Sequence, residues 1–447
     1  MRFNCTLLIS KLTIKLSKLF FNGGTNFPGK IALKLYPDIL KPLSFNYKVI
    51  IITGTNGKTT TTSMVYNMLL NNGEDVITNE TGANMLPGII SCFIDKYCIF
   101  KKNKSKYAVI EVDEANLKLV TQYITPYIIC VSNLFRDQMD RYGEVYTTLE
   151  KIMDGIKKTP ESILILNGDE SLLCDLNLTN TKIYYGFSCA VDNNTNLSLN
   201  ADAKFCKKCK SLYSYDFITY NHLGNFSCPN CGFKRPNLDY SITKINSLSS
   251  SGSVVQMDNY KFNISQSGTY NIYNALSAYT ISSFIGVSKE VIAYTLQSMK
   301  SSFGRQEVVN IEGKHLKIIL VKNPAGFDEA LKSVNLDDSD KSLALLLNDN
   351  YADGTDVSWI WDVDFENLNN TVIDKVFLSG IRLYDMSIRL KVAGLNENSF
   401  NVCDNYENLL SSISSNNNDN IYMLATYTAM TSFRKFLNNK GYLKKIW

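Results

Sequence analysis

Histidine is scarce in this sequence. Only His222 and His315 occur among its 447 residues. Hydrolysis of an amide by a cysteine nucleophile needs a histidine base beside the cysteine. His222 lies between two cysteine pairs and His315 follows Lys314 at the start of an expected strand, so both are interpreted as structural or solvated. The chain is therefore not expected to contain a complete glutaminase of the Cys-His-acid type.

Long apolar runs and a strong charge of one sign are also missing. The formal net charge of +4 does not by itself imply nucleic acid or an anionic membrane as a partner. No segment approaches a transmembrane span, and lysines interrupt residues 1–22 too often for a signal peptide. That stretch is expected to form an amphipathic helix with a basic face, either packed on the protein or resting on a membrane surface. The expected location is the cytoplasm, with the inner face of the membrane as the place of any membrane contact.

Cysteine is present in a pattern that predicts a metal site. Two Cys-x-x-Cys pairs, Cys206/Cys209 and Cys228/Cys231, have the spacing of a zinc ribbon, and four thiolates select tetrahedral Zn²⁺. Four ligands leave no open position, so the zinc is expected to be structural; a redox dithiol is the alternative. The other seven cysteines are scattered, as in a reducing cytosol. Nearby basic residues raise nucleic-acid binding, but no nucleic-acid partner is expected because the rest of the chain is nearly neutral.

Apolar strand-like runs alternate with helix-like segments in two parts of the chain. This rhythm predicts an α/β fold with parallel sheets, whose ligand sites lie at the carboxyl ends of the strands. The runs lie at 48–53, 107–113, 127–133 and 162–167, and then near 316–321, 342–347, 374–379 and 421–425. The expected organisation is an N-terminal amphipathic segment at 1–44, a central domain at 45–303 with a zinc ribbon inserted at 202–236, and a smaller α/β domain at 304–447.

A phosphate-binding loop follows the first apolar run. The stretch from Val49 to Thr60 reads VIIITGTNGKTT, in which a β-branched strand stops at a glycine turn and a helix begins. Backbone N–H groups and the positive end of such a helix face an anion, Lys58 reaches the β/γ-phosphates, and the Thr59 hydroxyl can hold Mg²⁺. The residues expected to bind a nucleoside triphosphate are Gly54, Thr55, Asn56, Gly57, Lys58, Thr59 and Thr60. The form T-G-T-N-G-K-T-T resembles the loop of the Mur ligase and folylpolyglutamate synthase superfamily.

Four further positions complete the expected site. Glu111 lies near the carboxyl end of the run 107–113, and a carboxylate there is expected to be a second Mg²⁺ ligand. Asn133 opens a segment that resembles the Mur ligase signature Asn-x-x-x-Asp-His-x-Asp-x-x-Gly, although Gln138 replaces the histidine, so the role of that histidine is not carried over. Asn271 and Arg305 match the superfamily's Gly-x-x-Asn-x-x-Asn-Ala and Gly-Arg segments. The resemblance implies that Asn271 contacts adenine, that Arg305 contacts phosphate, and that ATP and Mg²⁺ are the cofactors.

An acidic and aromatic block narrows the resemblance. The stretch 348–362 reads NDNYADGTDVSWIWD, and together with the zinc knuckles it resembles the MurT family, the ligase subunits of lipid II isoglutaminyl synthase. The resemblance extends from Gly24 to about residue 395. It implies that 45–303 is the Mur ligase central ATP-binding domain and that 304–447 is the MurT-type domain that contacts a glutaminase.

The resemblance also implies a reaction. The α-carboxyl of D-glutamate in the lipid II stem peptide is converted to the amide through an acyl phosphate, with Lys58 and Glu111 as catalytic groups. A GatD-type glutaminase partner supplies ammonia, and an aspartate of this chain completes its triad. Asp356 is assigned that role, with Asp349 and Asp353 as the alternatives. Contact with the membrane would come through the lipid II substrate.

Two other functions stay open. A stand-alone Mur ligase or folylpolyglutamate-synthase-like ligase would add an amino acid without a partner, but residues 321–324 read VKNP and lack the Asp and His of the Asp-Tyr-Ala-His-x-Pro segment of such ligases. A nucleic-acid-associated ATPase would use the zinc ribbon as a reader and would bind with a steep dependence on salt.

Overall fold

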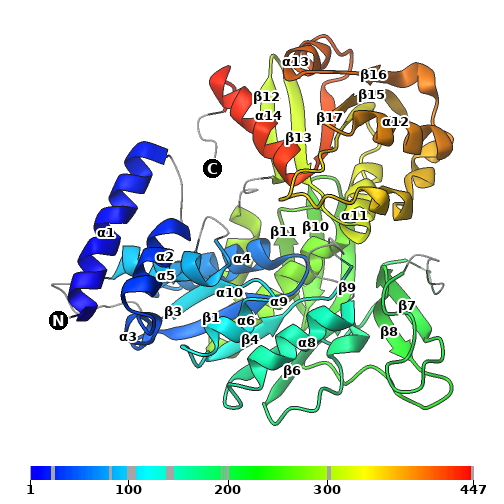
Figure 1. Ribbon diagram of the computed structural model, residues 1–447. Helices are drawn as coiled ribbons and strands as arrows, with labels where there is room; N and C mark the ends of the chain where they lie inside the picture. Colours follow the sequence, from blue (N-terminus) through cyan, green and yellow to red (C-terminus); the bar gives the residue numbers. More distant parts are fainter. Residues whose placement is uncertain are drawn as a thin grey trace.

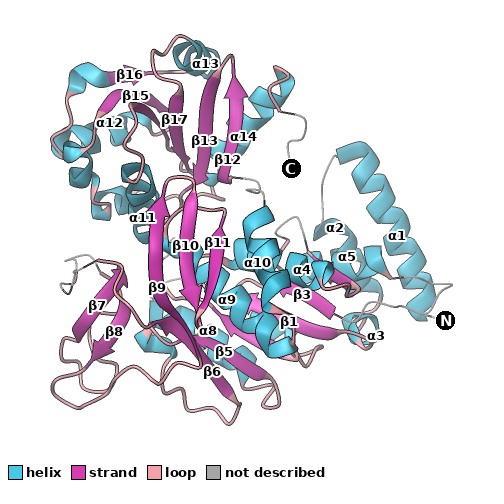
Figure 2. Ribbon diagram, turned by 180° about the vertical axis from the view of Figure 1, so that it is seen from behind, coloured by secondary structure: helices cyan, strands magenta, loops and turns pink. Residues whose placement is uncertain are grey.

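The computed structural model describes residues 2–21, 26–79, 83–97, 107–136, 145–192, 195, 197, 201–299 and 304–443. Two α/β units, each built on its own sheet, lie one above the other in Figure 1, and the first helix stands at one edge of the molecule. Figure 2 gives the same arrangement from behind.

The first sheet has nine strands in the order β11-β10-β9-β6-β5-β4-β1-β3-β2. The strands from β2 to β9 in this order are parallel to their neighbours, whereas β10 and β11 turn back as antiparallel hairpins. Their bounds are β1 Lys48–Thr53, β2 Val76–Thr78, β3 Tyr107–Glu111, β4 Ile128–Val131, β5 Ile163–Asn167, β6 Lys182–Phe187, β9 Tyr240–Ser249, β10 Gly252–Met257 and β11 Tyr260–Ile264. The four apolar runs predicted as strands in this part of the chain are confirmed as β1, β3, β4 and β5.

Helices cover both faces of this sheet because its central strands are apolar on both sides. Val49 and Ile51 of β1 join one hydrophobic core, and Ile50 and Ile52 join the other. The first core includes side chains of α1 Arg2–Phe21, α2 Asn26–Leu35, α3 Leu40–Ser44, α5 Leu86–Lys96, α6 Leu117–Val120 and α8 Val145–Ile156. The second core includes side chains of α4 Lys58–Asn71, α9 Thr269–Ile285 and α10 Lys289–Ser298.

The second sheet has six strands in the order β12-β13-β17-β14-β15-β16, and only β12 is antiparallel to its neighbour. The strands are β12 Arg305–Ile311, β13 Lys314–Leu320, β14 Lys341–Leu346, β15 Ile373–Ser379, β16 Phe400–Val402 and β17 Asn420–Ala425. One face packs against α11 Pro324–Asn335, α12 Leu383–Val392 and the 3-10 helices η2 Ser358–Asp362 and η3 Phe365–Asn370; the other packs against α13 Tyr406–Ser414 and α14 Tyr427–Asn439. The runs predicted near 316–321, 342–347, 374–379 and 421–425 are confirmed as strands.

The cysteine-rich segment forms a small unit between β6 and β9. Its two-stranded sheet pairs β7 Ser214–Tyr220 with β8 Leu223–Ser227, and its aromatic side chains form a separate hydrophobic cluster around the cysteines. Two further 3-10 helices, η1 Ser171–Leu173 and η4 Glu397–Ser399, complete the secondary structure of the described residues. Within those residues, no helix is both long enough and apolar enough to cross a membrane.

Candidate nucleotide site and the surfaces beside it

The loop between β1 and α4 has the geometry of a phosphate cradle. Gly54 and Gly57 have φ values of 119° and 86°, in the left-handed region that glycine adopts without strain. A Cβ atom on Gly54 would lie 2.4 Å from Oγ of Ser132, and one on Gly57 would lie 2.0 Å from Oδ1 of Asn274. Helix α4 begins at Lys58, so its first N–H groups and its positive end face the loop. The strand, glycine loop and helix predicted from the sequence are therefore present.

A buried ion pair holds Lys58. Its Nζ atom donates to Oε1 of Glu114 at 2.8 Å and to the carbonyl oxygens of Gly54 and Thr55 at 2.6 and 3.3 Å. Burial alone lowers the pKa of Lys58, but the carboxylates of Glu114 and Glu111 outweigh burial and raise it. Lys58 is therefore charged and directed back along its own loop. Glu114 was not predicted as a site residue from the sequence, although it follows Glu111, the last residue of β3, by only three positions.

Glu111 occupies the carboxyl end of β3 and is buried. Its Oε1 atom accepts a hydrogen bond from Nδ2 of Asn84 at 3.0 Å. Arg305, the first residue of β12, lies near enough to Glu111 for their charges to interact. Burial lowers the pKa of the Arg305 guanidinium, and the Glu111 carboxylate partly opposes that change. A carboxylate beside a phosphate loop and a hydroxyl of Thr59 are the donors that Mg²⁺ takes in proteins, so these residues fit the ion.

The loop after β4 fixes the phosphate loop from the neighbouring strand. The side-chain Oδ1 of Asn133 accepts a hydrogen bond from the N–H of Asn56 at 2.8 Å, and the backbone carbonyl oxygen of Asn133 accepts one from the N–H of Thr55 at 2.9 Å. The N–H of Phe135 in turn donates to Oγ1 of Thr55 at 3.1 Å. Asn133 therefore positions the loop directly. The rest of the Asn133 signature, with Gln138, lies in 137–144, outside the described residues.

Helix α9 reaches the same site from the other side. Asn271 lies in its first turn, where Nδ2 donates to the carbonyl oxygen of Ser267 and Oδ1 accepts from Nδ2 of Asn274 at 3.1 Å. Asn274 contacts Thr61 in the first turn of α4 through a 3.4 Å hydrogen bond. These bonds place Asn271 beside the start of α4.

Gln306 joins the two units next to Arg305. It has a φ of 61°, and the pairing of β12 with β13 is irregular at this residue. Its side-chain Oε1 accepts from N and Oγ of Ser267, both at 3.0 Å, while Nε2 donates to the carbonyl oxygen of Ser267 and to the Tyr270 hydroxyl at 2.9 and 2.6 Å. A second contact joins Nδ2 of Asn323, after β13, to Oδ1 of Asn56 at 3.3 Å. The second unit therefore contacts the phosphate loop itself.

The four predicted zinc ligands come together. The Sγ atoms of Cys206, Cys209, Cys228 and Cys231 all lie within 4.8 Å of one another, with the Cys206–Cys231 and Cys209–Cys228 pairs at 3.6 and 3.4 Å. Sulfurs held tetrahedrally at about 2.3 Å from zinc lie about 3.8 Å apart, so the cluster fits the ion. Hydrogen bonds from Ser211 lower the pKa of Cys209 to about 5, which favours the thiolate that zinc needs.

Buried charges attach the ribbon to the first sheet. Nε2 of His222, on the β7–β8 turn, pairs with Oε2 of Glu170 at 2.8 Å, and both side chains are fully buried. Glu170 also accepts from the N–H of Leu134, next to Asn133, at 3.1 Å. Arg235 pairs with the buried Asp169 at 2.7 Å. His222 is therefore structural, as predicted, and its partner lies one bond from the segment that fixes the phosphate loop.

The three aspartates of the acidic block differ in what they contact. Asp353 is buried and accepts from both the N–H, at 2.7 Å, and the hydroxyl of Thr428 at the start of α14. Asp349 lies 3.3 Å from Nε of Arg382. Asp356 is exposed, and its Oδ1 accepts from the N–H of Ser358 at 2.8 Å. Asp356 thus has a carboxylate oxygen available to a partner, whereas Asp353 is committed within its own domain.

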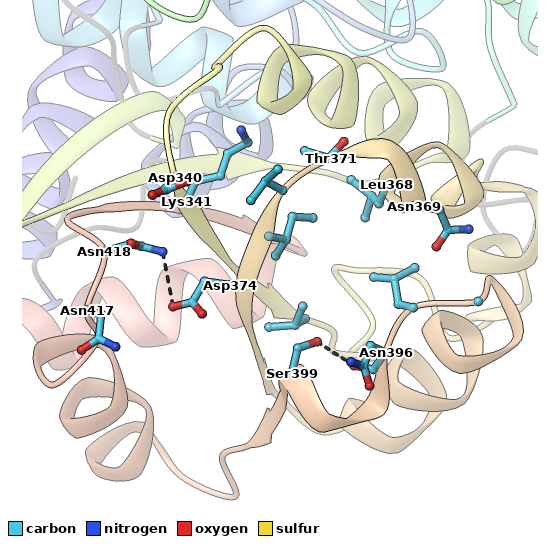
Figure 3. A pocket seen from close by; sticks show the side chains of 15 residues that line it. Asp340, Lys341, Leu368, Asn369, Thr371, Asp374, Asn396, Ser399, Asn417 and Asn418 are labelled. Carbon is cyan, nitrogen blue, oxygen red and sulfur yellow. Dashed lines mark hydrogen bonds between the residues drawn. The ribbon is translucent and has the colours of Figure 1, made fainter.

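A cavity of about 720 Å³ opens at the other end of the second sheet (Figure 3). It lies where β14, β15 and β17 begin, and asparagine and aspartate side chains line much of it. Asn418 reaches Asp374 there at 3.3 Å. The phosphate loop and the acidic block lie at the carboxyl ends of their strands, so this cavity is separate from both.

Comparison with known proteins identifies the class. Residues 52–282 match the family model of the Mur ligase middle domain, and residues 320–430 match that of the MurT ligase C-terminal domain. The pseudomurein peptide ligase type C of Methanothermus fervidus has a TM-score of 0.66 at 17% identity, covering 92% of this chain and 84% of that one. The MurF ligase of Thermotoga maritima in complex with ADP has a TM-score of 0.62 at 13% identity, covering 92% and 85%. The family model and the fold are those of a Mur ligase.

Sequence relatives narrow the class. The chain is 38% identical over 422 residues to the lipid II isoglutaminyl synthase (glutamine-hydrolyzing) subunit MurT of Streptococcus pneumoniae, with 94% of each chain covered. It is 35% identical over 387 residues to the subunit of the same name from Staphylococcus aureus strain COL, with 86% of each covered. The UDP-N-acetylmuramate–L-alanine ligase of Buchnera aphidicola is 25% identical, and the match covers 71% of this chain. The chain belongs to the MurT family.

Proposed function

We propose that this chain is the ligase subunit of a lipid II isoglutaminyl synthase. It amidates the α-carboxylate of D-glutamate in the lipid II stem peptide, with ATP as the energy source and ammonia from a GatD-type glutaminase. The observation that carries the proposal is that Lys58 and Arg305 both lie near enough to Glu111 for their charges to interact, in a chain whose second domain exposes Asp356. The relatives that bear this name match nearly the whole chain.

The chemistry needs charge neutralisation more than a nucleophile from the protein. A carboxylate is a poor acyl donor, so its oxygen first attacks the γ-phosphorus and ADP leaves, which gives an acyl phosphate. Lys58 and Arg305 would stabilise the charge on the transferring phosphoryl group. Thr59 and Glu111 would hold Mg²⁺, which supplies further charge neutralisation when bound. Ammonia then attacks the acyl carbon, phosphate leaves, and a proton lost from nitrogen completes the amide.

Lys58 must turn from Glu114 to phosphate during this cycle. In the described structure Glu114 neutralises it, and Asn133 holds the loop in register. Incoming phosphate would replace Glu114 as the counter-charge, so the loop would not have to refold. Asn271, beside the first turn of α4, would contact the adenine.

The glutaminase partner would use Asp356. Hydrogen bonds from Ser358 lower the pKa of Asp356, so its carboxylate is ionised at neutral pH. A triad needs an ionised acid that orients the histidine of the partner. Asp353 is already bound to Thr428, and Asp349 is paired with Arg382, which leaves Asp356 as the acid best suited to act across an interface.

Two nitrogen sources test the proposal. The chain alone should amidate lipid II with ammonium chloride and ATP, whereas glutamine should work only after the glutaminase is added. Asp356→Asn keeps the acceptor for the Ser358 N–H but removes the charge, so it should abolish only the glutamine-driven reaction. Asp349→Asn is the matched control and should keep both.

The products decide between the alternatives. Mass spectrometry of the stem peptide and release of ADP are the measurements. ADP release that requires an amino acid instead of ammonia would indicate a stand-alone ligase. Failure of the ammonium-driven reaction in folded Asp356→Asn would contradict the role given to that residue.

A further inference from the structure

Helix α1 has two faces, and the face that packs on the protein is the more polar one. Toward α2 and α5 it presents Phe3, Thr6, Leu7, Ser10, Ile14 and Ser17. Phe3 packs edge-on against Tyr36 and Tyr97, and Nε of Arg2 donates to the carbonyl oxygen of Leu35. The Ser10 hydroxyl is buried there without a hydrogen-bond partner. The helix is thus attached by a partly polar face, although burial normally selects apolar residues.

The outward face of α1 is apolar. Leu8, Ile9, Leu12 and Leu16 are 56%, 47%, 59% and 45% exposed. Positions 8, 12 and 16 repeat every four residues, so these side chains form one stripe along the helix. In both views α1 stands at the edge of the molecule, and no described element lies over its outer side (Figures 1 and 2). Large apolar side chains grouped on an exposed face mark an interaction surface.

The formal charge of the whole chain is concentrated in this helix. Helix α1 contains four basic residues and no acidic one. The chain has 46 basic and 42 acidic residues, so without the four in α1 the remainder has 42 of each sign. The low total charge therefore reflects a neutral body with a cationic edge, which the sequence totals alone did not reveal. Lys15 is exposed beside the stripe, and Lys11 lies on the same flank, where it reaches the carbonyl oxygen of Asp95 at 3.4 Å.

We propose that the outward face of α1 docks on the surface of an anionic lipid bilayer. An apolar stripe flanked by cations and free of acids is the pattern of a helix that lies in the headgroup region of a membrane. Charge favours a bilayer over a second copy of this chain, because two such helices repel one another while anionic headgroups attract lysines. The inference rests on the proposed function only in that a lipid substrate gives the enzyme a reason to approach a membrane.

Vesicle sedimentation tests the docking surface. The full chain should sediment with vesicles that contain phosphatidylglycerol, much less with pure phosphatidylcholine, and less at high salt. Leu8→Ser/Leu12→Ser should weaken binding about tenfold or more, because two exposed leucine side chains no longer enter the bilayer. Lys15→Gln should weaken it about fivefold, the effect of one basic residue at an anionic surface. Leu70→Ser, at a leucine of α4 that is 48% exposed, is the control and should bind like the wild type.

The outcomes separate this inference from the proposed function. The docking proposal would be refuted if the wild-type chain does not bind anionic vesicles, or if the folded double variant binds them with unchanged affinity. A concentration-dependent dimer that the double variant abolishes without any vesicle binding would also refute it. If docking is correct, the double variant loses amidation of substrate embedded in vesicles but retains ammonium-driven amidation of a soluble muropeptide. Vesicle binding by a wild type that amidates neither substrate would contradict the proposed function alone.

Discussion

Replacement of Glu114 by glutamine should destabilise the nucleotide-free protein strongly. The change removes the negative charge of the Glu114 carboxylate, whose Oε1 atom lies 2.8 Å from Nζ of Lys58 in a pair whose side chains are 10% and 6% exposed. Breaking a buried pair on one side costs about 3–5 kcal/mol, because the remaining charge stays buried. The carbonyl oxygens of Gly54 and Thr55 still accept from Lys58, so the lower end, about 3 kcal/mol, is expected. For a unit of roughly 250 residues this lowers Tm by about 6–12 °C.

Nucleotide should reverse much of this loss, since phosphate supplies the missing counter-charge. Differential scanning calorimetry with and without ADP and Mg²⁺ should therefore show a larger nucleotide-induced rise in Tm for Glu114→Gln than for the wild type. Glu111→Gln is the comparison variant. Its charge acts on Lys58 and Arg305 without a direct hydrogen bond to either in the described structure, and a glutamine oxygen can still accept from Asn84, so Tm should fall less than in Glu114→Gln. An unchanged Tm in nucleotide-free Glu114→Gln would refute the reasoning.

Three further changes test other contacts. Gly57→Ala should reduce ATP affinity more than tenfold in calorimetric titration, because the added Cβ would lie 2.0 Å from Oδ1 of Asn274. Gly73→Ala is the control: Gly73 has a similar φ of 81°, but nothing lies within 4 Å of an added Cβ, so this variant should bind ATP normally. His222→Gln should destabilise the protein most at low pH. Burial lowers the pKa of His222, but the nearby Glu170 carboxylate outweighs burial and raises that pKa above its ordinary value. The charged pair therefore contributes its full stability below about pH 6.5, and this contribution is lost as the pH rises through the raised pKa. Urea unfolding at pH 6 and pH 9 should show the gap to wild type narrowing, and a constant gap would contradict the charged pair. Asp353→Ala should lower the free energy of unfolding in urea by about 1–2 kcal/mol, because the hydrogen bonds of Asp353 with Thr428 at the start of α14 are lost. A change near zero would contradict this role.

The sequence predicted what is encoded locally. Buried parallel strands are continuous apolar runs, so β1, β3, β4 and β5 could be placed within a few residues. The two glycines of the phosphate loop likewise indicated a tight turn, because glycine adopts positive φ angles without strain. The four cysteines carry their spacing as the signal for the ribbon.

Contacts between distant segments could not be predicted in the same way. Glu114 lies 56 residues from Lys58, and Glu170 lies 52 residues from His222, so their pairing depends on which strands become neighbours. The hydrogen bond from Thr428 to Asp353 likewise depends on the second sheet, because the resemblance favoured Asp356 but said nothing of what Asp349 and Asp353 contact.

The attachment of Gln306 to Ser267 and Tyr270 has a mechanical consequence. Four hydrogen bonds fix this residue to the first unit while its backbone belongs to the first strand of the second. Any swing of the second unit that keeps these bonds has its fulcrum there. Arg305, next to Gln306 in the chain, would then move little relative to Glu111, whereas residues of the second unit far from Gln306 would move much further.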